Sequence, residues 1–334
     1  MSSNIKLSSA EISNLWSTYV NDSLTVCLMT HFKETVENQD INPLIDQTIQ
    51  VARDHMNTVK SLFNLESIVL PAGFPVEKHV IPNAPKLFSD LFYLEYMRHI
   101  CKVGIGSHGT AITLSAREDV RAIYSDFLND AVNLNNNIMS FMQKIGVFIR
   151  TPNMHYPEEV KFAHDQSYLR GYFGHRRPLL ALEVTHLTTT SIHNVLGQST
   201  CLGFAQVIGE EELRQYFIRG KRISEDIVGH VHDILLDSEV PAPMTWDADL
   251  TNSTTAPFSD QLMLFIIGTL SNVGISLYGA AMSTSMRHDV GALYANFIRK
   301  AALYGEDGLN LQIERGWLEQ PPQFIDHEKL AREK

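Results

Sequence analysis

The sequence predicts an all-α protein that consists of two tandem four-helix bundles. Three observations lead to this prediction: one segment of the chain returns 170 residues later, long stretches carry apolar residues at helical spacing, and a proline-rich connection interrupts each repeat. With 334 residues, 44% of them hydrophobic, the chain is long enough for two domains that each bury a core. Runs rich in Val, Ile and Thr do not alternate with polar residues, so strands are not expected.

The tripeptide Phe-Ser-Asp marks the repeat. It stands at 88–90 and again at 258–260. When the chain is shifted by 170 residues, 16 of the 40 positions in 88–127 are identical to those in 258–297. Chance would give only a few identities over this length. We conclude that one unit has been duplicated.

Copy one, residues 1–152, is expected to form four helices. A Ser-x-x-Glu capping box at its start predicts the first helix over 8–37, and an Asn-Pro pair opens the second over 42–65. The prolines that follow exclude a helix until the third, which is expected over 85–112 with Phe-Ser-Asp near its start. A second capping box, formed by Ser115 and Glu118, predicts the fourth helix, up to about residue 150.

Copy two, residues 177–323, repeats this plan. Its helices are expected near 179–207, 210–236, 257–284 and 285–319. Between the copies, residues 153–176 are expected to form an ordered connector that packs through its aromatic side chains, and residues 324–334 form a tail. In the third helix of each copy, glycines are expected to allow close approach of a neighbouring backbone: Gly104, Gly109, Gly274 and Gly279.

The lengths of the connections predict how the helices are arranged. The first and last connections in each copy are short, so the helices that they join are antiparallel neighbours. The middle connection has about 20 residues, and in extended form it can run the length of a helix of about 40 Å. Two hairpins joined by one long crossover are the arrangement of ferritin-like bundles.

Composition limits the partners and the location. Lys and Arg number 27 against 38 Asp and Glu, which gives a net charge of −11. This charge argues against nucleic acid or an anionic membrane as the main partner. Three cysteines without metal-binding spacing fit a reducing compartment, and the polar start lacks the apolar region of a secretory signal. A cytoplasmic location is therefore expected.

One stretch is long enough to cross a membrane. Residues 261–286 contain no charged side chain. Several Ser, Thr and Asn residues interrupt this stretch, and it stands alone in the chain. We interpret it as a central helix of the second bundle, so that no membrane insertion is expected.

A ferritin-like bundle suggests a di-metal carboxylate site, which uses Glu-x-x-His pairs. Copy two has one such pair, Glu183 and His186, near the start of its first helix. Three further groups are expected at the same level: His232, Asp260 and Glu314. The alternative is that Glu183 is a carboxylate favoured by the helix dipole in the first turn and His186 an interfacial histidine.

Copy one offers a second candidate metal site at the middle of its helices. The groups expected there are Asp22, His55, Glu95, His99 and Asp130. At an offset of 170, His55 corresponds to Glu225, Glu95 to Phe265 and His99 to Thr269, so a complete duplicated site is excluded. Either one copy carries a site or neither does. A buried histidine–carboxylate pair that only satisfies polar groups explains these residues equally well.

Other signatures of catalysis are absent from the sequence. It has no phosphate-binding loop, no dinucleotide-binding glycine motif and no Gly-x-Ser-x-Gly elbow. The Phe-Ser-Asp element is expected to be structural, with Ser or Asp capping the third helix and Phe closing the end of the bundle.

Two stretches carry a resemblance to a known family. They are "GFAQVIGEEELRQYFIRGKRI" at 203–223 and "YGEDGLNLQIERGWLEQPPQFIDHEKL" at 304–330. Together with the two Phe-Ser-Asp elements, they resemble domain of unknown function 3231, a family of Bacillus-type, spore-forming Firmicutes. The resemblance implies tandem ferritin-like, spore-coat-like helical proteins without an established reaction. It also implies histidines at the positions of Ile227 and Ile266, so that copy two has lost part of a polar site.

We therefore expect a cytoplasmic or spore-associated protein that is structural or binds a partner, rather than an enzyme. Its two copies are expected to pack through a pseudo-twofold interface as an intramolecular dimer, with a homo-oligomer as a further option. The alternative is a metal-binding protein or di-metal oxidoreductase that holds iron, manganese or zinc in only one bundle. The ligands would be Glu95, His99 and His55, or Glu183 and His186.

Overall fold

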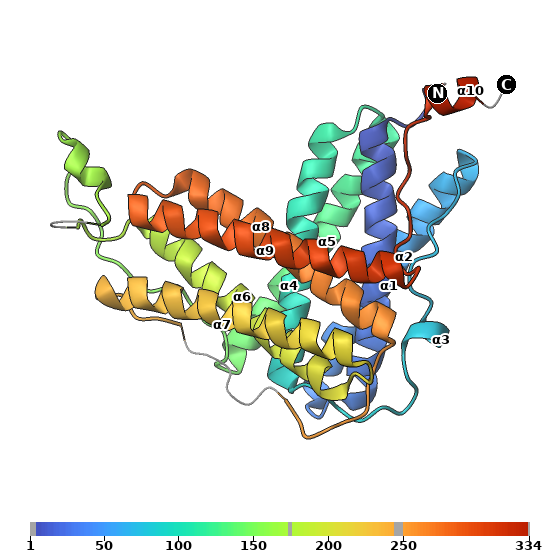
Figure 1. The fold of residues 1–334 in the computed structure, drawn as a ribbon, viewed down its shortest axis with the longest axis horizontal. Coiled ribbons are helices and arrows are strands. Elements are labelled where there is room, and N and C mark those ends of the chain that lie inside the picture. The colour runs from blue at the N-terminus through green and yellow to red at the C-terminus, as the bar shows by residue number, and fades with distance from the viewer. Residues whose placement is uncertain (1–4, 173–175, 244–249, 333–334) are drawn as a thin grey trace.

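The computed structural model describes residues 5–172, 176–243 and 250–332, and this part of the chain is helical, without a strand (Figure 1). Copy one consists of α1 (Ser9–Thr35), α2 (Asn42–Leu65), α4 (Asp90–Leu114) and α5 (Glu118–Lys144), with the short α3 (Val76–His79) in its crossover. Copy two consists of α6 (Ala181–Val207), α7 (Glu211–Asp237), α8 (Asp260–Thr284) and α9 (His288–Glu314). The tail ends in α10 (His327–Arg332). The all-α class and the two tandem copies are as predicted.

Contacts at the helix ends define the direction of each helix. The amide of Arg117, at the start of α5, donates to Glu11, at the start of α1. At the other end, the amide of Asn38, just after α1, donates to Asp90, at the start of α4. Helix α1 therefore runs parallel to α5 and antiparallel to α2 and α4. Each copy is two hairpins joined by a long crossover, because copy two has the matching contact between Glu183 and the start of α9.

The predicted role of Phe-Ser-Asp as a helix cap is confirmed. Ser89 Oγ accepts a hydrogen bond of 3.1 Å from Phe92 N, and Ser259 Oγ accepts one of 3.2 Å from Leu262 N. The third helix of copy one therefore begins at Asp90 rather than near residue 85. The residues before it are extended because they pair with the crossover of the other copy.

The predicted capping box at Ser115 is wrong. Helix α5 begins after Arg117, which makes no side-chain cap, and Ser115 Oγ donates backwards to the carbonyl of Ala111. The carboxylate of Glu11 accepts from the exposed amide instead. A side chain from another helix has thus replaced the local cap, which a sequence pattern alone does not reveal.

The fourth helices end earlier than predicted. Gly146 and Gly316 adopt positive φ angles of 76° and 64°, a conformation that suits glycine and ends a helix. The amides that follow, of Val147 and Trp317, donate back to carbonyls five residues earlier, at 3.0 and 2.8 Å. This glycine motif stops α5 at Lys144 and α9 at Glu314.

The offset between the copies is not constant. Glu11 and Glu183 occupy the same capping position, and Ser67 and Glu239 are the matching positive-φ residues after α2 and α7. Both pairs are 172 residues apart, so the first two helices are related by 172 rather than 170. His55 therefore corresponds to Ile227, not to Glu225 as the constant offset predicts.

Reciprocal contacts between the crossover segments join the two copies. Val80 pairs with Phe258 in an isolated antiparallel bridge, and Phe88 pairs with Leu250 in another. The two bridges are equivalent under the repeat, because Val80 and Leu250 are 170 residues apart, as are Phe88 and Phe258. Each copy thus presents the same surface to the other, as in a twofold-symmetric dimer.

The backbone hydrogen bonds beside these bridges follow the same symmetry. Ile81 N donates to Pro257 O at 2.9 Å, and its equivalent Thr251 N donates to Leu87 O at 3.0 Å. The Phe of each Phe-Ser-Asp element therefore lies at the junction between the copies, not at the end of its own bundle.

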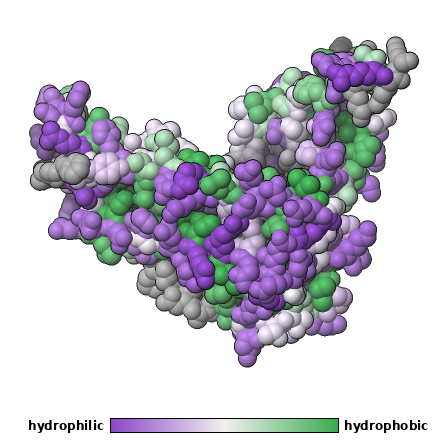
Figure 2. Space-filling view, viewed as in Figure 1, coloured by the Kyte–Doolittle hydropathy of each residue, from purple (hydrophilic) through white to green (hydrophobic). Residues whose placement is uncertain are grey.

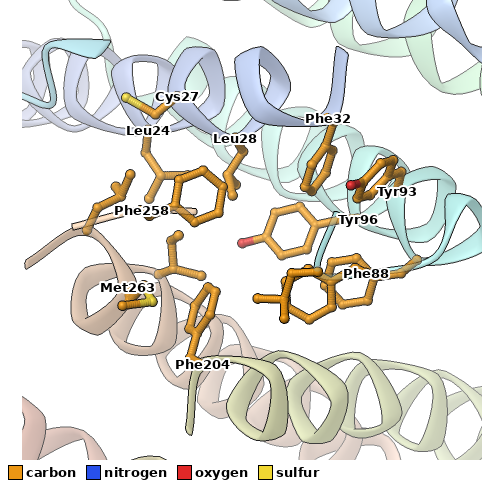
Figure 3. Close-up of a cluster of buried hydrophobic side chains, with 14 of the residues drawn as sticks. Leu24, Cys27, Leu28, Phe32, Phe88, Tyr93, Tyr96, Phe204, Phe258 and Met263 are labelled. Atoms are coloured by element: carbon orange, nitrogen blue, oxygen red, sulfur yellow. The ribbon is translucent and has the colours of Figure 1, made fainter. Parts of the chain in front are cut away.

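One hydrophobic core continues from copy one into copy two (Figure 3). Figure 3 shows aromatic side chains of both copies gathered in it, among them Phe32, Phe88, Tyr96, Phe204 and Phe258. Each bundle has a separate apolar cluster towards its other end. Away from the shared core the bundles diverge, and the space-filling view shows two arms with a hollow between them (Figure 2).

Helix α8 is the one helix in the described ranges that is long and apolar enough to cross a membrane, by length and composition. It packs against α6 and α9, and its buried face includes Leu262, Met263, Leu264 and Ile266. Contacts within the bundle therefore account for its apolar residues.

The four helical glycines have different surroundings. A Cβ added at Gly104 would meet Ala131 Cβ at 3.4 Å, and one added at Gly274 would meet His193 Nε2 at 3.1 Å. At Gly109 and Gly279 an added Cβ would have no neighbour within 4 Å. The expected close approach of a backbone is therefore wrong for Gly109 and Gly279, which face open space.

The connector packs over only part of its length. Phe162 and Tyr172 are largely exposed, whereas the guanidinium of Arg177 lies 4.7 Å from the ring centroid of Tyr168. The remaining aromatic residue that the sequence analysis relied on, Phe173, lies outside the described residues.

Substitution of Gly203 tests the junction between the copies. A Cβ there would lie 2.6 Å from Phe88 Cε1 and 2.9 Å from Leu250 Cδ2, both at the reciprocal bridge. Gly203→Ala should lower the free energy of unfolding by about 1–3 kcal/mol, because a buried ring must move. Urea unfolding measures the change.

The matched control is Gly279→Ala, which adds the same methyl group in open space and should raise stability by up to about 1 kcal/mol. If Gly203→Ala were as stable as the control, the close packing of Gly203 on Phe88 would be disproved.

Candidate functional site

A cavity of about 280 Å³ lies among the four helices of copy one. Side chains of α1, α2, α4 and α5 line it, and α8 of copy two contributes Thr269, Asn272 and Val273. The largest cavity at the equivalent level of copy two, lined by α6, α7, α8 and α9, has a volume of only about 50 Å³. The two copies therefore share a fold but differ in the space that they enclose.

His55 of α2 forms the polar centre of the larger cavity. Its Nδ1 lies 3.4 Å from Asp22 Oδ2 of α1, and its Nε2 lies 3.3 Å from Asp130 Oδ2 of α5. Its ring stacks on Phe127 with 3.8 Å between centroids. Only a protonated imidazole can donate at both nitrogens. The contacts bring together three of the five groups that the sequence placed at this level.

The electrostatics of this cluster follow from burial and from the ion pairs. Burial acts to lower the pKa of His55, but the contacts with Asp22 and then Asp130 outweigh it, so that the pKa is raised. Burial raises the pKa of Asp22, and its contact with His55 opposes this effect. His55 therefore holds its proton between two carboxyl groups.

His108 of α4 belongs to the same cavity, although sequence reasoning did not identify it. Its ring centroid lies 5.7 Å from that of His55, and only 7% of the residue is exposed. Its Nδ1 has no hydrogen-bond partner, and burial lowers its pKa to about 4. The signal in the sequence is its spacing from Cys101, Gly104 and Ala111, which puts all four on one face of α4.

Glu95 and His99 do not join His55 in a common site. Glu95 Oε2 accepts a hydrogen bond of 2.8 Å from Arg98, and Glu95 is not among the residues that line the cavity. His99 lies on the cavity wall, but its ring faces His193 of copy two, 5.5 Å away between centroids. Burial lowers the pKa of His99 well below its usual value. This histidine belongs to the contact between the copies.

Glu183 caps two helices. It is fully buried, and both of its oxygens accept hydrogen bonds of 2.8 Å from Arg177. The backbone amides of Leu180, Met286 and Arg287 donate to it as well, at 2.9, 3.1 and 3.0 Å. These five donors leave little capacity for a metal ion, and Glu11 has the same role in copy one.

The other groups expected near Glu183 are separated from it. His186 is half-buried, which lowers its pKa, and His232 Nε2 lies 2.9 Å from Ser191 Oγ. Asp260 starts α8 and Glu314 ends α9, at the opposite end of the bundle from Glu183. The predicted common level is therefore wrong for these two, because the crossover makes α8 antiparallel to α6.

No group of three or more His, Cys, Asp or Glu side chains among the described residues is arranged to hold a metal ion. In copy one, both ring nitrogens of His55 face carboxylates rather than a shared empty point. The site is thus a polar cavity with an ion-paired histidine.

Copy two has replaced every member of the polar cluster. With the corrected offsets, Asn194 stands for Asp22, Ile227 for His55, Tyr278 for His108 and Lys300 for Asp130. Tyr278 donates to Asn194 Oδ1 at 2.9 Å, and Lys300 pairs with Asp226 outside the bundle. The interior polar groups Tyr278 and Asn194 thus satisfy each other, and the space between them and Ile227 is small.

The fold and the site define an all-α protein of two tandem four-helix copies, one of which encloses a polar cavity. The model of the family described as "Protein of unknown function (DUF3231)" matches residues 1–160 and 168–330, one match for each copy. The chain belongs to this family.

Two further comparisons add little. A crystal structure of a "putative spore coat protein" from Bacillus halodurans is similar to this chain at 20% sequence identity and a TM-score of 0.42. The similarity covers 46% of this chain and 98% of that one. No curated protein matches the sequence.

The pH dependence of stability tests the structural role of Glu183. Burial acts to raise the pKa of Glu183, but Arg177 and the backbone amides outweigh it and lower the pKa to about 2. Because the folded pKa lies below the ordinary value of 4.5, the contribution of Glu183 to stability is complete above pH 4.5 and is lost as the pH falls towards 2. Urea unfolding from pH 7 to pH 2.5 should show this loss.

Glu183→Gln should lower the free energy of unfolding by about 3 kcal/mol at pH 7, because it leaves Arg177 buried without its carboxylate. It should also flatten the loss of stability below pH 4.5. Glu314→Gln, at an exposed position on α9, is the control and should retain both the stability and the pH dependence. An unchanged pH dependence in Glu183→Gln would rule out this role.

Proposed function

We propose that the chain is a small-molecule-binding protein, with its ligand site in the cavity of copy one and with copy two as a supporting scaffold. The observation that carries this proposal is the difference in enclosed space, about 280 Å³ in copy one against about 50 Å³ in copy two. Duplicated bundles with one structural task would be expected to fill their interiors alike, since voids destabilise a core.

The size and lining of the cavity suit a small organic ligand. An apolar cavity of about 150 Å³ is enough to bind benzene. Apolar walls with a few convergent polar groups are typical of ligand sites. Here Leu24, Ile100 and Leu134 supply apolar surface, and Asp22 and His108 supply polar atoms.

Binding is favoured over catalysis by the state of the reactive groups. The thiol of Cys101 lines the cavity, but burial raises its pKa to about 12, so it stays protonated and unreactive. His55, the natural candidate for a general base, is held between two carboxylates. Neither group is poised for proton transfer or nucleophilic attack near neutral pH.

Metal binding is the second function that copy one could carry. Asp22, His55, His108 and Asp130 come from four different helices, as ligands do in ferritin-like di-metal bundles. The arrangement of these groups does not favour it, because His55 already uses both nitrogens. Iron, manganese and zinc are therefore arms of the experiment below.

Copy two is proposed to contribute in two ways. Its α8 supplies three residues to the cavity wall, and its crossover fixes the orientation of copy one. The junction would then replace the interface of a dimer formed by a single-copy ancestor. A cytoplasmic or spore location is consistent with three free, buried cysteines.

Filling the cavity tests the proposal. Ala52 is buried on the wall, one turn before His55, and Ala52→Leu places a larger side chain in the open space. The probes are phenethylamine, 2-phenylethanol and phenylacetate, which share one aromatic body. At least one should bind the wild-type protein with a Kd of about 1 mM or tighter, as expected for so few atoms. Ligand-observed NMR measures binding.

Ala52→Leu should weaken that binding at least tenfold, with a melting temperature that is unchanged or higher. Ala295→Leu, exposed on α9 of copy two, is the control and should bind as the wild type does. If none of the three probes binds, the proposal fails. If iron, manganese or zinc binds at about one equivalent and is lost in His55→Ala, the metal-binding function replaces it.

A further inference from the structure

We infer that the cavity of copy one selects an organic cation, with an ammonium group at the Asp22–His108 end and an apolar or aromatic body. This inference rests on the proposed function and adds the chemical class of the ligand. It is drawn from the charges that line the cavity, from two buried atoms without partners and from the changes in copy two.

The charges around the cavity are unbalanced. Asp22 lines it, Asp130 lies behind His55, and no Lys or Arg is among the residues of its wall. One imidazolium therefore faces two carboxylates, with a net charge of −1 when all three are ionised. His99 and His108 add no positive charge near neutral pH, because burial lowers the pKa of each. A cationic ligand would complete this charge balance, and an anion would worsen it.

Two buried polar atoms at the cavity have no hydrogen-bond partner. One is Asp22 Oδ2, whose 3.4 Å contact with His55 lacks the geometry of a hydrogen bond, and the other is His108 Nδ1. An unpaired buried acceptor costs about 1–3 kcal/mol, so such atoms are rare without a reason. An ammonium group has three hydrogens and can donate to the carboxylate and to a neutral imidazole at once.

The rest of the wall suits the body of such a ligand. Tyr96 and Tyr124 present aromatic rings, and Val103 and Leu134 present aliphatic surface. Aromatic faces attract cations, and aliphatic walls exclude water and so strengthen the charged contact. An amine with an attached ring therefore uses both kinds of surface.

Copy two serves as an internal contrast. Asp22 is replaced by neutral Asn194, and Asp130 by Lys300. The proposed cation site has thus lost two negative charges and gained a positive one where the cavity has closed. The change of charge and the loss of volume together indicate that the cation site is confined to copy one.

The experiment compares three probes of one shape that differ in charge: phenethylamine (cation), 2-phenylethanol (neutral) and phenylacetate (anion). Kd values are measured by ligand-observed NMR at pH 7 with the full chain. Phenethylamine should bind at least tenfold more tightly than 2-phenylethanol, and phenylacetate should show no binding. NOEs should connect the methylene next to nitrogen with the ring of His108.

Asp22→Asn should weaken phenethylamine binding at least tenfold and change 2-phenylethanol binding less than twofold. Asp226→Asn, a partly exposed acid on α7 of copy two, is the matched control and should change neither. If Asp22→Asn does not fold, the wild-type selectivity and the NOEs to His108 decide the question.

The outcomes separate the two proposals. If no probe binds, the proposed ligand site itself is refuted. If 2-phenylethanol or phenylacetate binds as tightly as phenethylamine, the cavity is a ligand site but the inference of a cation is wrong.

Discussion

The reciprocal clasp between the two crossover segments is the interaction on which the rest of the structure depends. Val80 with Phe258 and Phe88 with Leu250 are one contact made twice, once from each copy. The clasp turns two separate bundles into one body with a shared aromatic core (Figure 3). It also determines where α8 lies, and α8 supplies one wall of the cavity in copy one. The site is therefore a property of both copies, although its polar groups come from copy one.

Buried polar groups must find partners, and the two copies meet this requirement in different ways. In copy two, Tyr278 and Asn194 satisfy each other, and Ile227 fills the position of a histidine. In copy one, Asp22 and His108 keep unpaired atoms beside an open space. Once a copy has the clasp and the caps, its interior can change without loss of the fold. Copy two has become a support, whereas copy one has kept the features of a site.

The sequence predicts the repeat, the hairpins and the Ser89 and Ser259 caps because each depends on local chemistry or direct identity. It does not predict that Glu11 caps α5, because that contact joins residues far apart in the chain. His55 was paired with the wrong residue because few identities mark the offset of 172 in the first two helices. His55, Asp22 and Asp130 could be placed together from their level in the bundle. His108 and the cavity could not, because a void depends on the volumes of side chains from five helices.

A crystal structure of the full chain soaked in phenethylamine tests the central claim most directly, since it shows at once which copy binds and through which atoms. The account predicts one amine in copy one, with its nitrogen within hydrogen-bond distance of Asp22 Oδ2 and His108 Nδ1, and none in copy two. Ring density that lies in both copies, or an amine turned away from Asp22 and His108, would contradict it.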